Sequence, residues 1–106
     1  MKLTAIERRI YAIADSERFR AAHCLKFSIE RLRAERNAFR RAARKYEATG
    51  SKCRSMWAHP VTGLIDTSDE PRIAKLDADA KAHAFRAAML HVDVVMLEEQ
   101  LRDLLR

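Results

Sequence analysis

The sequence predicts an all-helical fold, in which a long antiparallel hairpin resembling a coiled coil joins a short N-terminal helix to make a three-helix bundle. Two long runs of residues at alternating spacings of three and four predict the hairpin, because this pattern is typical of helices packed lengthwise. We call the two runs together the seam. The C-terminal run consists of Ile73, Leu76, Ala80, His83, Ala87, Leu90, Val94, Leu97, Leu101 and Leu104. The N-terminal run consists of Ala22, Leu25, Ile29, Leu32, Arg36, Phe39, Ala43 and Tyr46.

The first predicted helix covers residues 4–15. It opens with Thr4-Ala5-Ile6-Glu7, a capping-box pattern in which a threonine and a glutamate satisfy each other's backbone donors. Asp15 and Ser16 are favourable caps for a following helix, but no glycine or proline separates the two segments. The first helix therefore either folds back on the second or runs straight into it.

The second predicted helix covers residues 17–48 and the third covers residues 69–105. We expect the second helix to end at Gly50, because glycine readily adopts the left-handed conformation that terminates helices. Residues 49–68 hold the remaining turn signals and form the predicted loop. The third helix begins with acidic residues and with Pro71 in its first turn, where proline is tolerated.

The predicted register places Tyr46 opposite Ile73. In the same counting Arg36 falls beside His83, and both occupy seam positions where an apolar residue is expected. A polar residue on a seam fixes register or partner choice at a cost in stability. The alternative is that both side chains tilt outward and keep their polar ends in water.

Length and composition indicate one intracellular domain. The 106 residues suffice for a single helical domain, and stability would gain from self-association. The first residues are too charged for a signal peptide, and no window approaches the roughly 18 apolar residues of a membrane span. We therefore expect a soluble cytoplasmic protein with no membrane contact. Cys24 in the second helix and Cys53 in the predicted loop are too far apart for an intrachain disulfide, so we expect both thiols to be reduced.

A second apolar stripe on the third helix exceeds what one hairpin needs. Its members, which we call the outer stripe, are Ala78, Ala82, Phe85, Met89, Val92 and Met96. Either the first helix covers this stripe as core, or the stripe is an interface with methionines as an adaptable surface and Phe85 as an anchor. A partner protein and a second copy of the chain would both fit. Trp57, in the predicted loop, either pins the loop or anchors a partner.

Positive charge is concentrated in the first half of the chain. Residues 1–50 carry 13 Lys and Arg against 6 Asp and Glu, whereas residues 51–106 carry 8 against 9. A predicted basic face on the second helix consists of Arg33, Arg40, Arg41 and Arg44. Such a face could follow a phosphate backbone or meet an acidic protein. The alternative is an ordinary solvated face, and no known nucleic-acid-binding motif accompanies the arginines.

No motif predicts catalysis, a cofactor or a metal. Cys53 and His59 would form only one ligand pair, whereas a structural zinc needs about four ligands.

Our hypothesis is therefore a non-enzymatic regulator, an inhibitor or anti-activator, that occupies a surface of a partner protein such as a transcription regulator or nucleoprotein machinery. We expect it to be a homodimer. Short helical regulators without active sites are the analogy for this hypothesis, which depends on size and architecture. The second hypothesis is a nucleic-acid-binding accessory protein that uses the basic face.

Overall fold

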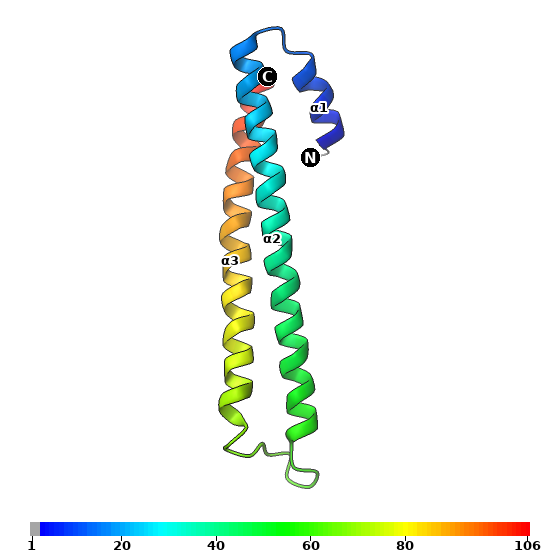
Figure 1. Cartoon of the computed structure of the whole chain (residues 1–106), viewed down its shortest axis with the longest axis vertical. Helices are drawn as coiled ribbons and strands as arrows, with labels where there is room; N and C mark the ends of the chain where they lie inside the picture. Colours follow the sequence, from blue (N-terminus) through cyan, green and yellow to red (C-terminus); the bar gives the residue numbers. More distant parts are fainter. Residues whose placement is uncertain (1–2) are drawn as a thin grey trace. The chain divides into compact units, whose positions relative to one another are not determined.

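The computed structural model describes residues 3–106 and confirms the all-helical prediction (Figure 1). It contains three helices: α1 (Leu3–Tyr11), α2 (Ser16–Trp57) and α3 (Glu70–Leu104). The long helices α2 and α3 pack against each other, and no strand is present in the described part of the chain. The chain forms two compact units. The terminal unit comprises residues up to Glu35 together with Met89–Arg106, and the hairpin-end unit comprises Arg36–Ala88.

Burial follows the predicted seam along both long helices. Every residue of the C-terminal run and every residue of the N-terminal run is buried or half-buried. Each large apolar side chain removed from water in this way contributes about 1.5–3 kcal/mol. The burial of two lengthwise rows therefore holds α2 and α3 together within each unit.

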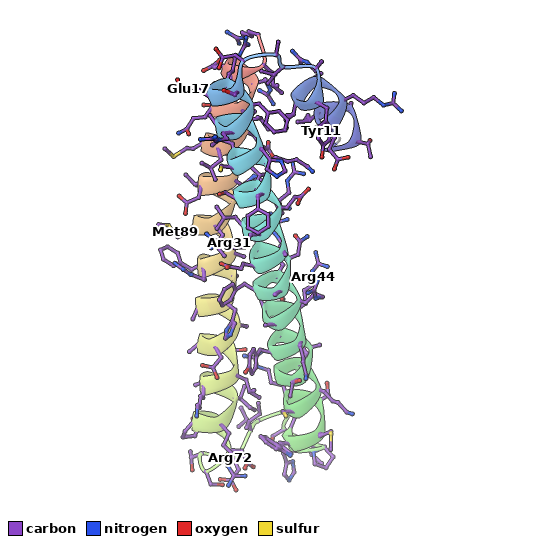
Figure 2. The ribbon with its side chains drawn as sticks, turned by 45° about the horizontal axis from the view of Figure 1, so that its top comes forward. Tyr11, Glu17, Arg31, Arg44, Arg72 and Met89 are labelled. Carbon is purple, nitrogen blue, oxygen red and sulfur yellow. The ribbon has the colours of Figure 1, made fainter. Side chains whose placement is uncertain are left out.

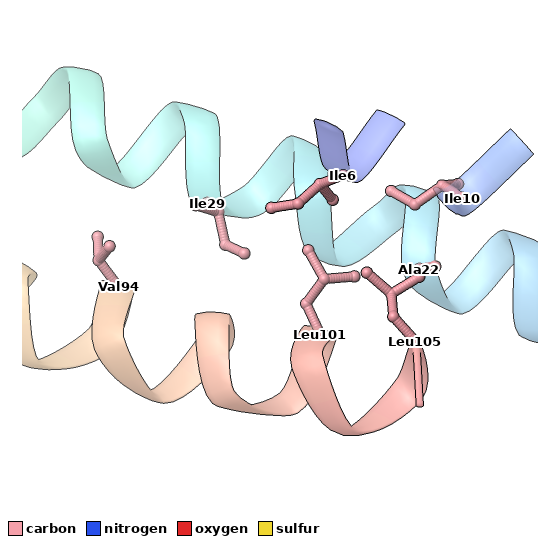
Figure 3. Packing of buried hydrophobic residues seen from close by; sticks show 7 residues of the cluster. All are labelled: Ile6, Ile10, Ala22, Ile29, Val94, Leu101 and Leu105. Carbon is pink, nitrogen blue, oxygen red and sulfur yellow. The ribbon is translucent and has the colours of Figure 1, made fainter. Parts of the chain in front are cut away.

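In the terminal unit, α1 folds back and completes a hydrophobic core. The core cluster consists of Ile6, Ile10, Ala22, Ile29, Val94, Leu101 and Leu105 (Figure 3). Ile6 and Ile10 are the contribution of α1 to this core, and each is almost completely buried. Ala22 has no side chain beyond Cβ and is itself fully buried, so it lets neighbouring helices approach closely. This packing excludes a straight run from the first helix into the second.

The helix ends in the terminal unit are capped by specific side chains. The Asp15 Oδ1 atom accepts a hydrogen bond from the Arg18 backbone N–H at 3.0 Å, so Asp15 caps α2. This cap explains why α1 ends before the predicted residue 15. At the same end of the unit, the guanidinium of Arg18 donates to the Leu104 carbonyl oxygen at 2.6 Å, and that of Arg9 donates to the Leu105 carbonyl oxygen at 2.7 Å. Both arginines thus satisfy carbonyls at the end of α3.

An ion pair ties α1 to α2. The Lys26 Nζ atom lies 2.6 Å from Glu7 Oε1 and 3.4 Å from Glu30 Oε1. The hydrogen bond to Glu7 is the largest cause that raises the pKa of Lys26, and partial desolvation of the ammonium opposes it. The Glu7 side chain, which the sequence suggested as half of a capping box, thus contributes to docking α1.

In the hairpin-end unit, α2 continues through Gly50 and ends at Trp57, so the predicted end at residue 48 is wrong. Gly63 is the one described residue with a positive φ, whereas Gly50 keeps the helical conformation. Gly50 is buried, and a Cβ atom added to it would lie 3.3 Å from Asp77 Oδ1 and 3.8 Å from Leu76 Cβ. The glycine therefore permits a close approach of α2 to α3 where the sequence suggested a helix end.

The predicted register is wrong by one heptad. With Tyr46 opposite Ile73, Leu76 would lie beside Ala43, whereas the structure places it beside Gly50, seven residues further along α2. A pattern that repeats every seven residues forms similar apolar contacts in registers one heptad apart. The connection then decides between these registers. It spans residues 58–69, and the predicted loop of residues 49–68 began too early.

The shorter connection is organised by hydrogen bonds of its own. The His59 backbone N–H donates to the Leu64 carbonyl oxygen at 2.7 Å, and the His59 Nδ1 atom accepts from the Val61 N–H at 3.1 Å. The Asp66 carboxylate accepts a hydrogen bond from the Ser68 backbone N–H at 3.1 Å, and this bond lowers the pKa of Asp66. These bonds direct the chain into α3 at Glu70.

Replacing Gly50 with leucine should lower the free energy of unfolding by about 1–2 kcal/mol, because overpacking against Leu76 and Asp77 outweighs the gain in helix propensity. Denaturant unfolding followed by circular dichroism measures the change. Ala48→Leu, at an exposed site on the same helix, is the matched control and should change stability by less than about 0.5 kcal/mol. An increase in stability for Gly50→Leu would contradict the close approach of the two helices.

Candidate protein-interaction surface

The outer stripe of α3 is exposed along its whole length. Its large members have exposed fractions of 67% at Phe85, 49% at Met89, 55% at Val92 and 53% at Met96. Both alanines of the stripe are exposed as well. α1 does not cover the stripe, because its isoleucines pack into the core cluster instead. Of the two interpretations of this stripe, coverage by α1 is therefore wrong.

The outer stripe lies on the opposite face of α3 from the seam. Successive residues of a helix are separated by about 100°, which places Met89 about 140° and Val92 about 160° around the helix from Val94. Leu90 and Val94 are buried, as this geometry requires. Figure 2 shows Met89 on the side of α3 that faces away from α2. One helix thus carries one apolar row in the core and another in solvent.

The hairpin-end unit presents a second group of exposed apolar side chains. Trp57 is half-buried as the last residue of α2, and it lines a cleft with residues of the connection, including His59, Leu64 and Asp69. Met56 and Leu64 are exposed. The sequence pattern predicted Trp57 as a binding residue, whereas Met56 and Leu64 were not predicted. Their apolar character within a turn-rich segment is a signal that could have found them.

The arginines of the predicted basic face are not equivalent. Arg40, Arg41 and Arg44 are exposed, and Figure 2 shows Arg44 on the side of α2 that faces away from α3. Within residues 3–106 none of these three forms an ion pair. Arg33 differs, because it is half-buried and pairs with the Glu98 carboxylate within the terminal unit. The uncompensated part of the basic face is therefore the group of Arg40, Arg41 and Arg44.

His83, one of the two polar residues predicted on the seam, lies among aromatic rings. Its ring centroid is 5.1 Å from that of Tyr46 and 5.7 Å from that of Phe39. The His83 Nδ1 atom is 2.7 Å from the Asp79 carbonyl oxygen, which orients the ring. Arg36, the other polar seam residue, is half-buried. His83 thus packs in the seam by its ring face and keeps a hydrogen bond within α3.

Within residues 3–106, the side chains that can bind a metal do not form a cluster. Among the described residues, no three His, Cys, Asp or Glu side chains are grouped as a metal site requires. Cys24 and Cys53 are both free thiols, and Cys53 lies within α2, not in the predicted loop. None of the helices described is long and apolar enough to cross a membrane.

Comparison with known proteins adds no further assignment. No family model matches the chain, and neither a curated protein nor a solved structure gives a significant match. Function is therefore inferred from the exposed surfaces of the chain.

Replacing both Phe85 and Met89 with glutamate should leave the helical circular dichroism unchanged at low protein concentration, because both side chains are already exposed. We expect the free energy of unfolding to change by less than about 1 kcal/mol. Leu90→Glu is the matched control, because it places a charge in the seam and should strongly destabilise the fold. Loss of helix in the double variant would place the outer stripe in the core.

Proposed function

We propose that this chain is a non-enzymatic, protein-binding regulator that acts by occupying a surface of another protein, as an inhibitor or anti-activator does. The observation that carries the proposal is the exposed outer stripe on a helix whose opposite face is already buried. Each large apolar side chain left in water forgoes about 1.5–3 kcal/mol of burial. Such residues aligned on one helix face are typical of an interaction site, whereas scattered ones need no explanation.

The composition of the stripe and the net charge indicate the kind of partner. Methionine side chains adapt to irregular surfaces, and Phe85 offers a large anchor. The positive charge excess lies in residues 1–50, outside the stripe, and favours an acidic partner by accelerating encounter. Transcription regulators and nucleoprotein machinery are the partner classes that we propose. The cleft beside Trp57 at the hairpin end is a second place where a partner could be anchored.

Capture of partners from nuclease-treated lysate of the source cell, read by mass spectrometry, tests the proposal. We expect one stoichiometric protein to be retained by the unaltered chain and lost with Phe85→Glu. Phe27→Glu is the matched control, because Phe27 is 66% exposed on α2 and lies outside the stripe. Retention of the partner by Phe85→Glu would move the binding surface to the hairpin end, where Trp57→Ala would be the next variant. Recovery of no specific protein would contradict the proposal.

A second candidate function is the binding of nucleic acid by the uncompensated arginines. Their exposure without ion pairs within the described residues favours it, since such side chains are available for phosphates. We expect the double change Arg40→Ala and Arg44→Ala to reduce the slope of log affinity against log salt by roughly two. Electrophoretic or anisotropy titrations at several salt concentrations measure the slope. Arg20→Ala, exposed on α2 outside this face, is the control, and an unchanged slope in the double variant would remove this candidate.

A further inference from the structure

We infer that the outer stripe of α3 binds the same stripe of a second copy, with the two α3 helices antiparallel. This inference rests on the proposed function in one respect, which is that the stripe is a protein-binding surface. It goes further by naming the first occupant of that surface. Two observations carry it: the spacing of the stripe and the order of the charges that flank it.

The spacing of the stripe is that of a coiled-coil contact face. From Ala78 to Met96 the intervals are four, three, four, three and four residues, which matches the heptad alternation of the seam. This stretch is about 27 Å long at about 1.5 Å per residue. All six members are exposed, so nothing in the described chain occupies this face. A second helix with the same spacing could therefore pack along it.

The flanking charges change sign near the middle of the stripe. Lys81 and Arg86 lie in its first half, whereas Asp93 and Glu99 lie at or beyond its second half. All four are exposed, and none of them forms an ion pair within residues 3–106. Two residues depart from this order: Arg102, which lies beyond the end of the stripe, and the half-buried Asp79, which lies in its first half. The positive and negative ends of the same face are thus complementary to each other.

An antiparallel pair of α3 helices would form each contact between opposite charges twice. A two-fold axis between Leu90 and His91 would set Met89 against Val92 of the partner subunit and Phe85 against Met96 of the partner subunit. Thioether sulfur packs favourably against an aromatic ring. In this antiparallel pair, the two-fold axis places residues on one flank of α3 beside residues on the same flank of the partner's α3. An isologous interface repeats every such contact.

On one flank Arg86 would then lie near Asp93 of the partner subunit, and on the other flank Lys81 would lie near Glu99 of the partner subunit. A parallel pair would instead bring Arg86 near Lys81 of the partner subunit and Asp93 near Glu99 of the partner subunit, which costs affinity through like-charge repulsion. The charge order therefore selects the antiparallel arrangement.

Sedimentation equilibrium at low ionic strength tests the inference with a charge swap. We expect the unaltered chain to form a dimer at about 100 μM protein. Arg86→Glu should weaken the dimer about tenfold, because it replaces two attractive contacts with two repulsive ones. Adding Asp93→Arg to that variant should restore the dimer, since the charges are then exchanged within the same pairs. Arg20→Glu is a control for net charge and should leave the dimer unchanged.

The association state of the unaltered chain and of its two charge variants either supports or overturns the antiparallel dimer. A monomer at about 100 μM would overturn the inference, and so would a dimer that the single change does not weaken or that the second change does not restore. Circular dichroism of each variant at low concentration excludes unfolding as the cause of a monomer. The outcome for the proposed function is separate: a monomeric chain that still captures one partner protein through Phe85 would leave that function intact. A restored dimer that captures no protein would support the inference and contradict the function.

Discussion

Burial of the seam between α2 and α3 is the interaction on which the rest of the structure depends. Helices of this composition gain most of their stability from tertiary packing of an apolar face and little from intrinsic propensity. The seam also fixes the rotation of each long helix about its own axis. Because Leu90 and Val94 point into the core, the residues half a turn away must point into solvent. The exposure of the outer stripe is therefore a consequence of the seam, as is the exposure of Arg44 on α2.

The terminal unit shows why the outer stripe remains uncovered. α1 carries only a few apolar side chains, and the largest buried ones, Ile6 and Ile10, pack into the core cluster. Hydrogen bonds from Arg9 and Arg18 to the last carbonyl groups of α3 add polar contacts at the same end. These interactions leave the outer face of α3 exposed. We made two proposals for the occupant of this face, a partner protein and a second copy of the chain. Both follow from the fact that one face of α3 is buried and the other is exposed.

The hairpin end illustrates how one residue acquires different roles in sequence and in structure. A glycine after a long helical pattern ordinarily marks a helix end, yet Gly50 lies inside α2 and allows contact with Leu76. The four–three–four spacing of Tyr46, Gly50, Cys53 and Trp57 continues the seam beyond the predicted end, and all four residues are buried or half-buried. Gly50 thus permits close packing of α2 against α3 and does not end α2, as the local sequence suggested it would. It also moved Trp57 from the middle of a predicted loop to the last turn of a helix.

The sequence by itself determined the helical class, the two rows that form the seam and the phase of the outer stripe, because all three follow from periodicity along a regular helix. Only the tertiary structure decided the register of α2 against α3, since a heptad pattern is compatible with shifts of seven residues. It also decided that α1 folds back, because Asp15 and Ser16 suit either geometry until burial of Ile10 favours one. The exposure of the outer stripe was decided in the same way. Periodicity specifies which residues share a face, whereas competition among all elements of the chain decides which faces are covered.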